Sequence, residues 1–431
     1  MCKTFITNVN IKQVAVVIMF LLLIGGQGET ARAQLSVNMP YTMYGVGDVQ
    51  FNQYLQNMGM GGLSQGYRSH LSVNDVNPAS YAAFDSNSFV FETTLLSQFY
   101  RQKTTAITQE SDYYTLGNLS LGFPVTSWWS VGAGLKPYSR LGYKVSDRET
   151  GTEAGAVDYI YEGNGGISQL FLGSAIEPFD GFSVGANFSY LFGNLDDQAT
   201  VESDSVGVYQ TNMIQSDRVS GLLVGFGLQY HHEVTEHRHI TVGATFGNQT
   251  DVGVTSKETL RRREPNALRY DTIAHNILQE GNITLPAYYG IGVFSGINEN
   301  WEAGIDFQWQ NWEDFSYLGD DEDFNNHYEI ASGVRFSPDA ETYSTIFRRF
   351  QYKAGLRYGQ SYLRPDDKTL NEFGISFGVG IPIRGTQSGL TIDVELSRRA
   401  AIDNSNMHED FFRVNLGINI FERWFVRRRF N

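Results

Sequence analysis

Apolar and polar residues alternate with a period of two over most of the chain, beginning near Ser88. Between residues 182 and 192, for example, phenylalanine, valine, alanine and tyrosine alternate with serine, glycine and asparagine. This period is that of β-strands with one apolar face. Fourteen such segments can be counted, near 88–102, 112–125, 128–145, 157–178, 181–198, 215–232, 239–255, 284–297, 301–312, 326–338, 348–361, 371–384, 387–399 and 409–422.

The face opposite the apolar one carries mainly glycine and small polar residues. A soluble β-sandwich would fill its core with bulky residues from a second sheet, whereas a barrel with lipid outside and a wet lumen needs only one apolar face. We therefore predict an all-β fold, a 14-stranded antiparallel transmembrane β-barrel over residues 88–425.

The links between the segments indicate the same architecture. Links after even-numbered segments are mostly short, as at Asp180-Gly181 and Arg384-Gly385, whereas 199–214, 256–283 and 313–325 are long and polar. Bacterial barrels have an even strand number, short periplasmic turns and long outer loops. We expect the short turns to face the periplasm.

Composition excludes several other classes of protein. Charged residues make up 18% of the chain, aromatic residues 14%, and 45 of the 431 residues are glycine. The aromatic content argues against disorder, and the net charge of -15 argues against nucleic acid as a partner, because a basic surface would be needed.

The first 33 residues have the pattern of a secretory signal peptide. Lys3 and Lys12 precede an apolar run from Val14 to Ile24, and an A-x-A site ends at Ala33. We expect cleavage after Ala33, and this removes Cys2, the only cysteine. The mature chain would then have neither a disulfide nor a thiolate metal site.

Residues 34–87 do not alternate. They combine turn-forming residues with short apolar stretches and are too few to make a comfortable core of their own. A fourteen-stranded barrel has a lumen wider than its own side chains fill. We interpret 34–87 as an N-terminal plug inside that lumen; the alternative is a disordered periplasmic tail.

The chain ends with the pattern expected of a barrel's last strand. Apolar residues alternate through 409–422, and the aromatic residues Trp424 and Phe425 follow. This is the kind of strand that barrel-insertion machinery recognises, so that machinery is an expected partner. Residues 426–431 are expected to form a periplasmic C-terminal tail.

These residues resemble one known family. A plug with the stretch Met58-Gly59-Met60-Gly61-Gly62 and the tripeptide Asn77-Pro78-Ala79, leading into the first of fourteen strands, is similar to the FadL-type outer-membrane transporters. The resemblance implies passive transport of small hydrophobic molecules such as fatty acids across the outer membrane of a Gram-negative bacterium. Some members of this family, such as PorV, are instead accessory barrels that bind proteins in secretion or assembly complexes, and this alternative stays open.

Pro137 is the most informative single residue of the barrel. Proline cannot donate a hydrogen bond to a β-ladder, so it belongs at an edge or a bulge. Because a closed barrel has no edges, we expect a break in pairing between the segment 128–145 and a neighbour. The resemblance implies that such a break is a lateral exit for an apolar ligand into the membrane; a harmless bulge near the rim is the alternative.

Four further residues are candidates for ligand binding or gating. We interpret Asn77, Pro78 and Ala79 as fixing the plug to the inner wall at the break, although Asn-Pro also commonly begins a simple turn. Phe84 either lines an apolar ligand site or packs the plug against the wall, as do Met58 and Met60.

The sequence indicates no enzyme, metal site or cofactor. The G-x-S-x-G spacing occurs at 62–66, 181–185 and 374–378, but no Ser-His-acid set stands out in the sequence. His231, His232, His237 and His239 surround a short predicted turn, where successive strand residues point to opposite faces. The acidic run Asp320 to Asp323 lacks the spacing of an EF-hand loop.

Overall fold

The computed structural model describes residues 39–50, 53–103, 108–152, 155–203, 205, 207–235, 238–264, 267, 269–298, 300–338, 346–401 and 408–424. The predicted signal peptide with its cleavage site, residues 34–38 of the predicted plug, His237 and the tail 426–431 lie outside these ranges.

The chain forms a closed antiparallel barrel of 14 strands, as predicted. Closure comes from β19, which pairs with β2 from His408↔Lys103 to Arg423↔Ser88. The strands of the barrel are β2 (Ser88–Lys103), β3 (Thr108–Pro124), β4 (Trp129–Thr152), β5 (Gly155–Phe179), β6 (Phe182–Ser203), β7 (Gln210–Thr235), β8 (Arg238–Gly247) with β9 (Thr250–Arg263), β10 (Asp271–Leu285) with β11 (Tyr288–Gly296), β12 (Trp301–Gln310), β15 (His327–Phe336), β16 (Gln351–Gln360), β17 (Leu370–Pro382), β18 (Gly389–Ala401) and β19 (His408–Arg423).

Two of these strands are interrupted. Residues 248–249 separate β8 from β9, and β7 pairs with both of them in turn. Pro286 and Ala287 separate β10 from β11, and a proline there cannot supply a ladder hydrogen bond.

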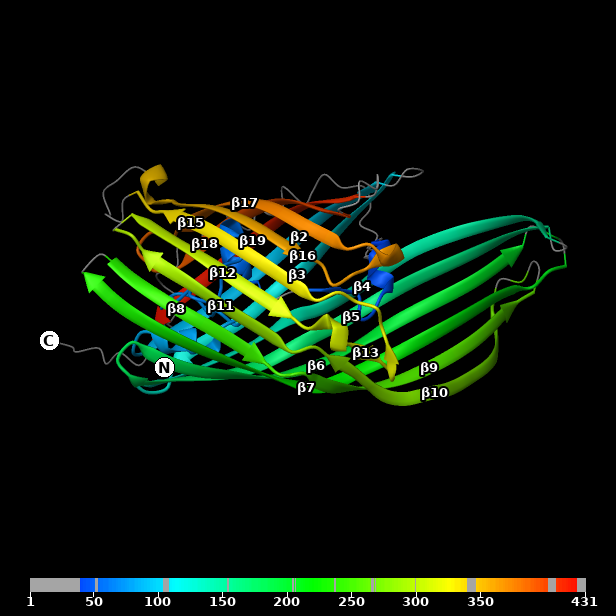
Figure 1. Cartoon of the computed structure of the whole chain (residues 1–431), viewed down its shortest axis with the longest axis horizontal. Coiled ribbons are helices and arrows are strands. Elements are labelled where there is room, and N and C mark those ends of the chain that lie inside the picture. The colour runs from blue at the N-terminus through cyan, green and yellow to red at the C-terminus, as the bar shows by residue number, and fades with distance from the viewer. Residues whose placement is uncertain are drawn as a thin grey trace, which may run out of the picture. The chain divides into compact units, whose positions relative to one another are not determined.

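Two of the predicted long polar loops are mostly strand, which corrects the sequence-based boundaries. β6 and β7 leave only 204–209 between them, and β9 and β10 occupy most of 256–283. Both faces of a sheet are polar where it leaves the membrane, so the apolar period disappears although the strand continues. The green strands β7, β9 and β10 reach the right-hand end of Figure 1, which β15 and β16 do not.

The outer face of the barrel is apolar. Large hydrophobic side chains are exposed on strands all around the ring, among them Leu172, Phe188, Leu222, Ile291, Ile305, Phe377 and Leu396. Such a face is stable against lipid rather than water, so the barrel is a transmembrane one. None of the helices in the described residues is long and apolar enough to cross a membrane.

Residues 39–50 and 53–87, called here the inner segment, lie against the inner face of the barrel. The segment contains η1 (Pro40–Met43), β1 (Asp48–Val49), η2 (Leu55–Met60) and η3 (Pro78–Ala83). A Cβ atom added to Gly185, Gly243, Gly333 or Gly355 would come within 2.8 Å of its backbone. Glycines on opposite sides of the barrel therefore allow the segment to pack closely against the wall.

Buried charges of the wall hold the inner segment. The Glu92 carboxylate of β2 accepts hydrogen bonds from the Tyr54 hydroxyl (2.7 Å) and the Val73 N–H (2.9 Å). The Asp306 carboxylate of β12 accepts the N–H groups of Ser64 (2.6 Å) and Gln65 (2.9 Å). Burial, with the nearby Glu92 charge, raises the pKa of the Tyr54 hydroxyl, which keeps its proton and remains a donor.

Candidate functional site: a break in the barrel wall

Pairing between β3 and β4 stops just before Pro137. The two strands pair from Pro124↔Ser130 to Leu119↔Leu135 and no further, although both continue. On its other side, β4 has a register shift against β5 between Pro137 and Ser139. Among the described residues, the ladder between neighbouring wall strands is therefore interrupted at the proline that the sequence singled out.

The inner segment takes up the freed edge of β4. β1 pairs antiparallel with it, Asp48↔Arg140 and Val49↔Ser139. The N–H of Gln50 donates to the Tyr138 carbonyl and that of Met39 to the Gly142 carbonyl, both at 2.8 Å. The backbone amides and carbonyls that β3 leaves unpaired are thus partly satisfied from inside the barrel.

Gly47 is required for this close approach. Its φ is +86°, and an added Cβ would lie 2.2 Å from the Arg140 carbonyl oxygen. Only glycine combines this left-handed backbone with the absence of a side chain.

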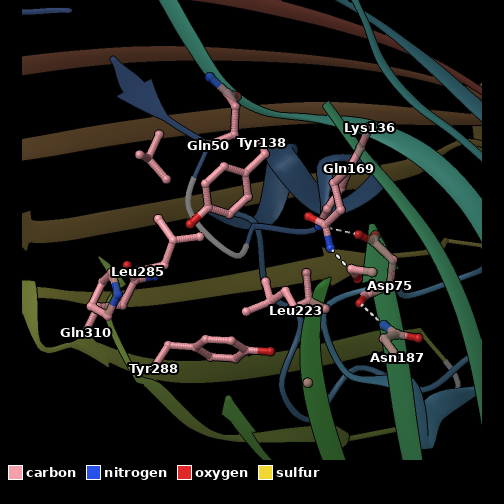
Figure 2. Close-up of a pocket in the computed structure, with 15 residues that line it drawn as sticks. Gln50, Asp75, Lys136, Tyr138, Gln169, Asn187, Leu223, Leu285, Tyr288 and Gln310 are labelled. Carbon is pink, nitrogen blue, oxygen red and sulfur yellow. Dashed lines mark hydrogen bonds and ion pairs between the residues drawn. The ribbon is translucent and has the colours of Figure 1, made fainter. Parts of the chain in front are cut away.

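A small cavity lies inside the wall next to the break (Figure 2). Tyr138, Leu223, Leu285 and Tyr288 give it an apolar side. On its polar side the Lys136 ammonium pairs with the Asp75 carboxylate, and the Asn187 amide donates to the Asp75 carbonyl (2.7 Å). Its volume of about 40 Å³ holds a few water molecules.

A second cavity, of about 80 Å³, shares Asp75 and Lys136 with the first and includes Pro137 in its lining. A network of buried charges from β15 to β19 borders it. Arg357 pairs with Glu329 (3.1 Å), Glu372 and Glu395 (2.9 Å), and Arg413 pairs with Glu395 (2.6 Å). Each buried charge has an oppositely charged partner, and this attraction offsets the cost of removing the charges from water. The inner wall is therefore polar here.

The half of the lumen nearer the long loops is apolar instead. A cluster of buried side chains from β4–β7, β9, β10 and the inner segment fills it, including Val46, Leu191, Val219, Val252 and Ile283. An aromatic cluster from two distant loops, Trp312, Phe315, Phe324 and Tyr362, belongs to the same core. The Trp312 and Tyr362 rings stack with centroids 4.0 Å apart, and the Tyr362 hydroxyl donates to the Gly47 carbonyl (2.5 Å).

Sequence reasoning missed this aromatic cluster because it treated 313–325 as a polar outer loop. The signal that could have found it is the apolar spacing of Trp312, just before that loop, and of Phe315 and Phe324 within it. Isolated aromatic residues in a loop do not show whether they face lipid, water or the lumen.

Asn77, Pro78 and Ala79 lie against β6 and β7, not at the break itself. Asn77 caps η3 by accepting the Ala79 N–H (3.2 Å), and its amide donates to the carbonyls of Gln65 (2.7 Å) and Leu228 (3.2 Å). An added Cβ on Gly185 would meet Pro78 and Ala79 at about 2.5 Å. The tripeptide therefore ties the inner segment to the wall, while Asp75, two residues earlier, reaches the break.

Phe84 does not line either cavity. It stacks on Tyr81 and packs with Val73 and Phe421 in a separate apolar cluster. Met58 lines the second cavity, and Met60 packs against Gly333 and Gly355.

Among the described residues, no group of three His, Cys, Asp or Glu side chains could hold a metal ion. His231 faces His239 with ring centroids 5.3 Å apart, and its Nδ1 lies 2.8 Å from the Thr241 hydroxyl.

Comparisons with known proteins agree with this architecture. Solved structures with the same fold include a Pseudomonas aeruginosa FadL homologue (TM-score 0.58, 12% identity, 88% of this chain and 99% of that chain). Two toluene transporters are also similar: TbuX of Ralstonia pickettii (TM-score 0.58, 13%, 87% and 99%) and TodX of Pseudomonas putida (TM-score 0.57, 16%, 88% and 100%). At these identities the likeness concerns the fold, and this fold is that of the FadL-type barrels, as the sequence resemblance implied.

No curated protein matches the chain. The BamG family model matches residues 10–431, which is nearly the whole length. The chain therefore belongs to the BamG family.

Proposed function

We propose that this protein is a passive transporter of small hydrophobic molecules in the outer membrane of a Gram-negative bacterium, with lateral exit between β3 and β4. The observation that carries the proposal is the interrupted ladder at Pro137. A ligand leaving there enters the membrane without crossing the wet periplasmic end of the lumen.

The apolar half of the lumen nearer the long loops supports a hydrophobic ligand. An incoming molecule would meet the aromatic cluster, then the apolar core, then the Leu223 and Leu285 side of the first cavity. The solved barrels of the same fold include toluene transporters, and this likeness supports the same class of ligand here.

For a ligand to leave through the break between β3 and β4, the short strand β1 has to move. The two cavities that share Asp75 and Lys136 hold only a few waters, and β1 covers the break with two residue pairs. The N–H groups of Gln50 and Met39 add two more backbone hydrogen bonds to β4, and each backbone hydrogen bond contributes only about 0.5–1.5 kcal/mol net.

A disulfide lock tests this exit. Val49→Cys with Ser139→Cys joins directly opposed residues of β1 and β4, a spacing that suits a disulfide. We expect the oxidised protein to lose uptake of toluene and of a long-chain fatty acid into proteoliposomes, and reduction to restore it. The matched control is Leu119→Cys with Leu135→Cys, which joins β3 and β4 where they already pair. Unchanged uptake by the oxidised Val49–Ser139 variant would rule out lateral exit.

A second candidate function is that of an accessory barrel that binds partner proteins in an outer-membrane secretion or assembly complex without transport. The charge network around Arg357 and the small cavities favour it, because an apolar molecule gains nothing from passing paired, buried charges. Purification under mild conditions separates the two functions. Mass spectrometry of the extract is expected to find bound lipid or hydrocarbon for a transporter, and a stoichiometric protein partner for an accessory barrel.

A further inference from the structure

Arg140 of β4 is a buried arginine without an anionic partner. It is 5% exposed, and neither of its terminal nitrogens, Nη1 and Nη2, has a hydrogen-bond acceptor among the described residues. Asp48 lies directly opposite it on β1 but pairs with Arg399 (3.7 Å). The Arg140 guanidinium is therefore a buried charge that forms no ion pair within the described part of the chain.

Other buried arginines inside the barrel do have such partners. Arg399 pairs with Glu409 (2.5 Å), and Arg413 pairs with Glu395 (2.6 Å). Removing a charge from water is costly, and an opposite charge at short distance offsets that cost. Arg140 lacks this compensation. A buried polar group that is left unsatisfied in a folded protein calls for an explanation, and a ligand that completes its bonding is one.

The Arg140 side chain crosses the break in the wall. Its Cζ atom lies 3.3 Å from the centroid of the Tyr113 ring of β3. Tyr113 is opposed by Gln98 of β2, but the ladder between β3 and β4 ends at Leu119↔Leu135, so no backbone pairing joins the strands here. A cation–π contact offsets only part of the cost of burying a guanidinium, and the Tyr113 ring supplies no anion.

The surroundings of this contact are aromatic. Tyr113 packs against a buried cluster of Met39, Tyr100 and Phe411, in which the Tyr100 and Phe411 rings lie 5.4 Å apart. Such rings pack well against another flat apolar ring, and the fork of Nη1 and Nη2 matches the two oxygens of a carboxylate. The second cavity, which Pro137 lines, has only about 80 Å³, so a small ligand requires less rearrangement here than a long-chain one.

We propose that Arg140 binds the carboxylate of a small aromatic acid that leaves through the break. The inference names the ligand class of the exit and rests on the proposed transport function. Nη1 and Nη2 donate two parallel hydrogen bonds to the carboxylate oxygens, and the ring of the ligand lies beside Tyr113. Because both nitrogens are covered in this structure, binding requires the same movement of β1 as exit does. A neutral hydrocarbon of the same shape gains nothing from the guanidinium.

Three probes of similar shape test the proposal on the purified full-length protein. They are para-methylbenzoate, its uncharged amide, and toluene, which lacks the carboxylate altogether. Titration calorimetry in detergent measures binding, and uptake into proteoliposomes measures transport. The test variant is Arg140→Met. The matched control is Arg101→Met, which removes an exposed arginine of β2 that pairs with Glu110 (2.8 Å).

We expect the wild type and Arg101→Met to bind para-methylbenzoate about tenfold more tightly than the amide, and Arg140→Met to lose this preference. The ratio of para-methylbenzoate uptake to toluene uptake should fall by a similar factor in Arg140→Met alone. Replacing an unpaired buried charge by an apolar side chain removes a cost from the folded state. The thermal midpoint of Arg140→Met without ligand should therefore be no lower than that of the wild type.

Two results would overturn the inference. An unchanged preference for para-methylbenzoate in Arg140→Met would mean that this arginine does not recognise the carboxylate, while uptake of toluene would leave transport itself standing. A clearly lower thermal midpoint of Arg140→Met would assign the charge to the folded structure instead. If the wild type takes up none of the probes, the transport function fails, and binding of para-methylbenzoate that depends on Arg140 would still support the site.

Discussion

The Lys136 ammonium of β4, one residue before Pro137, pairs with the Asp75 carboxylate of the inner segment. Both residues line both cavities beside the wall break. Its side chains are 17% and 5% exposed, so each charge depends on the other for much of its solvation.

This pair should show strong thermodynamic coupling. Asp75→Asn or Lys136→Met alone leaves a mostly buried charge or polar group unpaired, and we expect each to lower the free energy of unfolding by up to about 3 kcal/mol. The double variant should lose less than the sum of the two, with a coupling of at least ~1 kcal/mol. Thermal or denaturant unfolding in detergent measures the cycle, and strictly additive losses would mean that the pair contributes nothing.

Gly47 should tolerate no side chain. Gly47→Ala places a Cβ against the Arg140 carbonyl at a φ of +86°, so β1 must leave β4 or the backbone must shift. We expect faster proteolysis of the inner segment and a loss of stability above ~2 kcal/mol. The control is Gly207→Ala, where φ is +95° but an added Cβ meets nothing within 4 Å. Equal effects at both positions would trace the loss to backbone strain alone.

Removing the inner segment should open the barrel to ions. Deletion of residues 40–84 leaves every wall strand intact from Ser88 onward, and the inner charges then face water. A fourteen-stranded barrel without a plug leaves an aqueous path. We expect stable, large conductance steps in planar bilayers, compared with the full-length protein prepared in the same way. If the deletion variant conducts no more than the full-length protein, the segment does not close the lumen.

The alternation of short and long links between the strands indicates how the barrel is oriented in the membrane. Gly319 lies in the link between β12 and β15 and Gly385 in the tight turn between β17 and β18, and both have positive φ and open space around them. Short turns face the periplasm in bacterial barrels. An epitope inserted at Gly319 is expected to be labelled on intact cells and one at Gly385 only after lysis; the reverse pattern would invert the topology.

The aromatic cluster should contribute much of the stability at the end of the barrel that carries the long loops. Trp312 is fully buried, whereas Trp128 is 56% exposed. Trp312→Ala removes a packed indole and is expected to cost about 3–5 kcal/mol, while Trp128→Ala should cost far less. Unfolding measurements on both variants test the difference, and similar costs would indicate that the two loops do not pack inside the lumen.

Local patterns were enough to establish the barrel. Each membrane-crossing strand must present apolar residues to lipid at every second position, so the alternation in stretches such as 182–192 and 409–422 is visible without any neighbour. The break at Pro137 was also predictable, because a missing N–H is a property of the residue itself. The same logic could not find the ends of β9 and β10, where both faces are polar.

What fills the lumen was decided by tertiary structure alone. Nothing near Asp75 in the chain indicates Lys136 as its partner, and nothing near Trp312 indicates Tyr362. Pro137 predicts that β3 leaves β4, but not that β1 takes its place, since that depends on the close approach of Gly47 in the inner segment to the Arg140 carbonyl. Contact with lipid requires an apolar residue at every second position of each strand, and this pattern is visible in the sequence. Contacts inside the barrel join residues that are far apart in sequence, and only closure of the barrel brings those residues together.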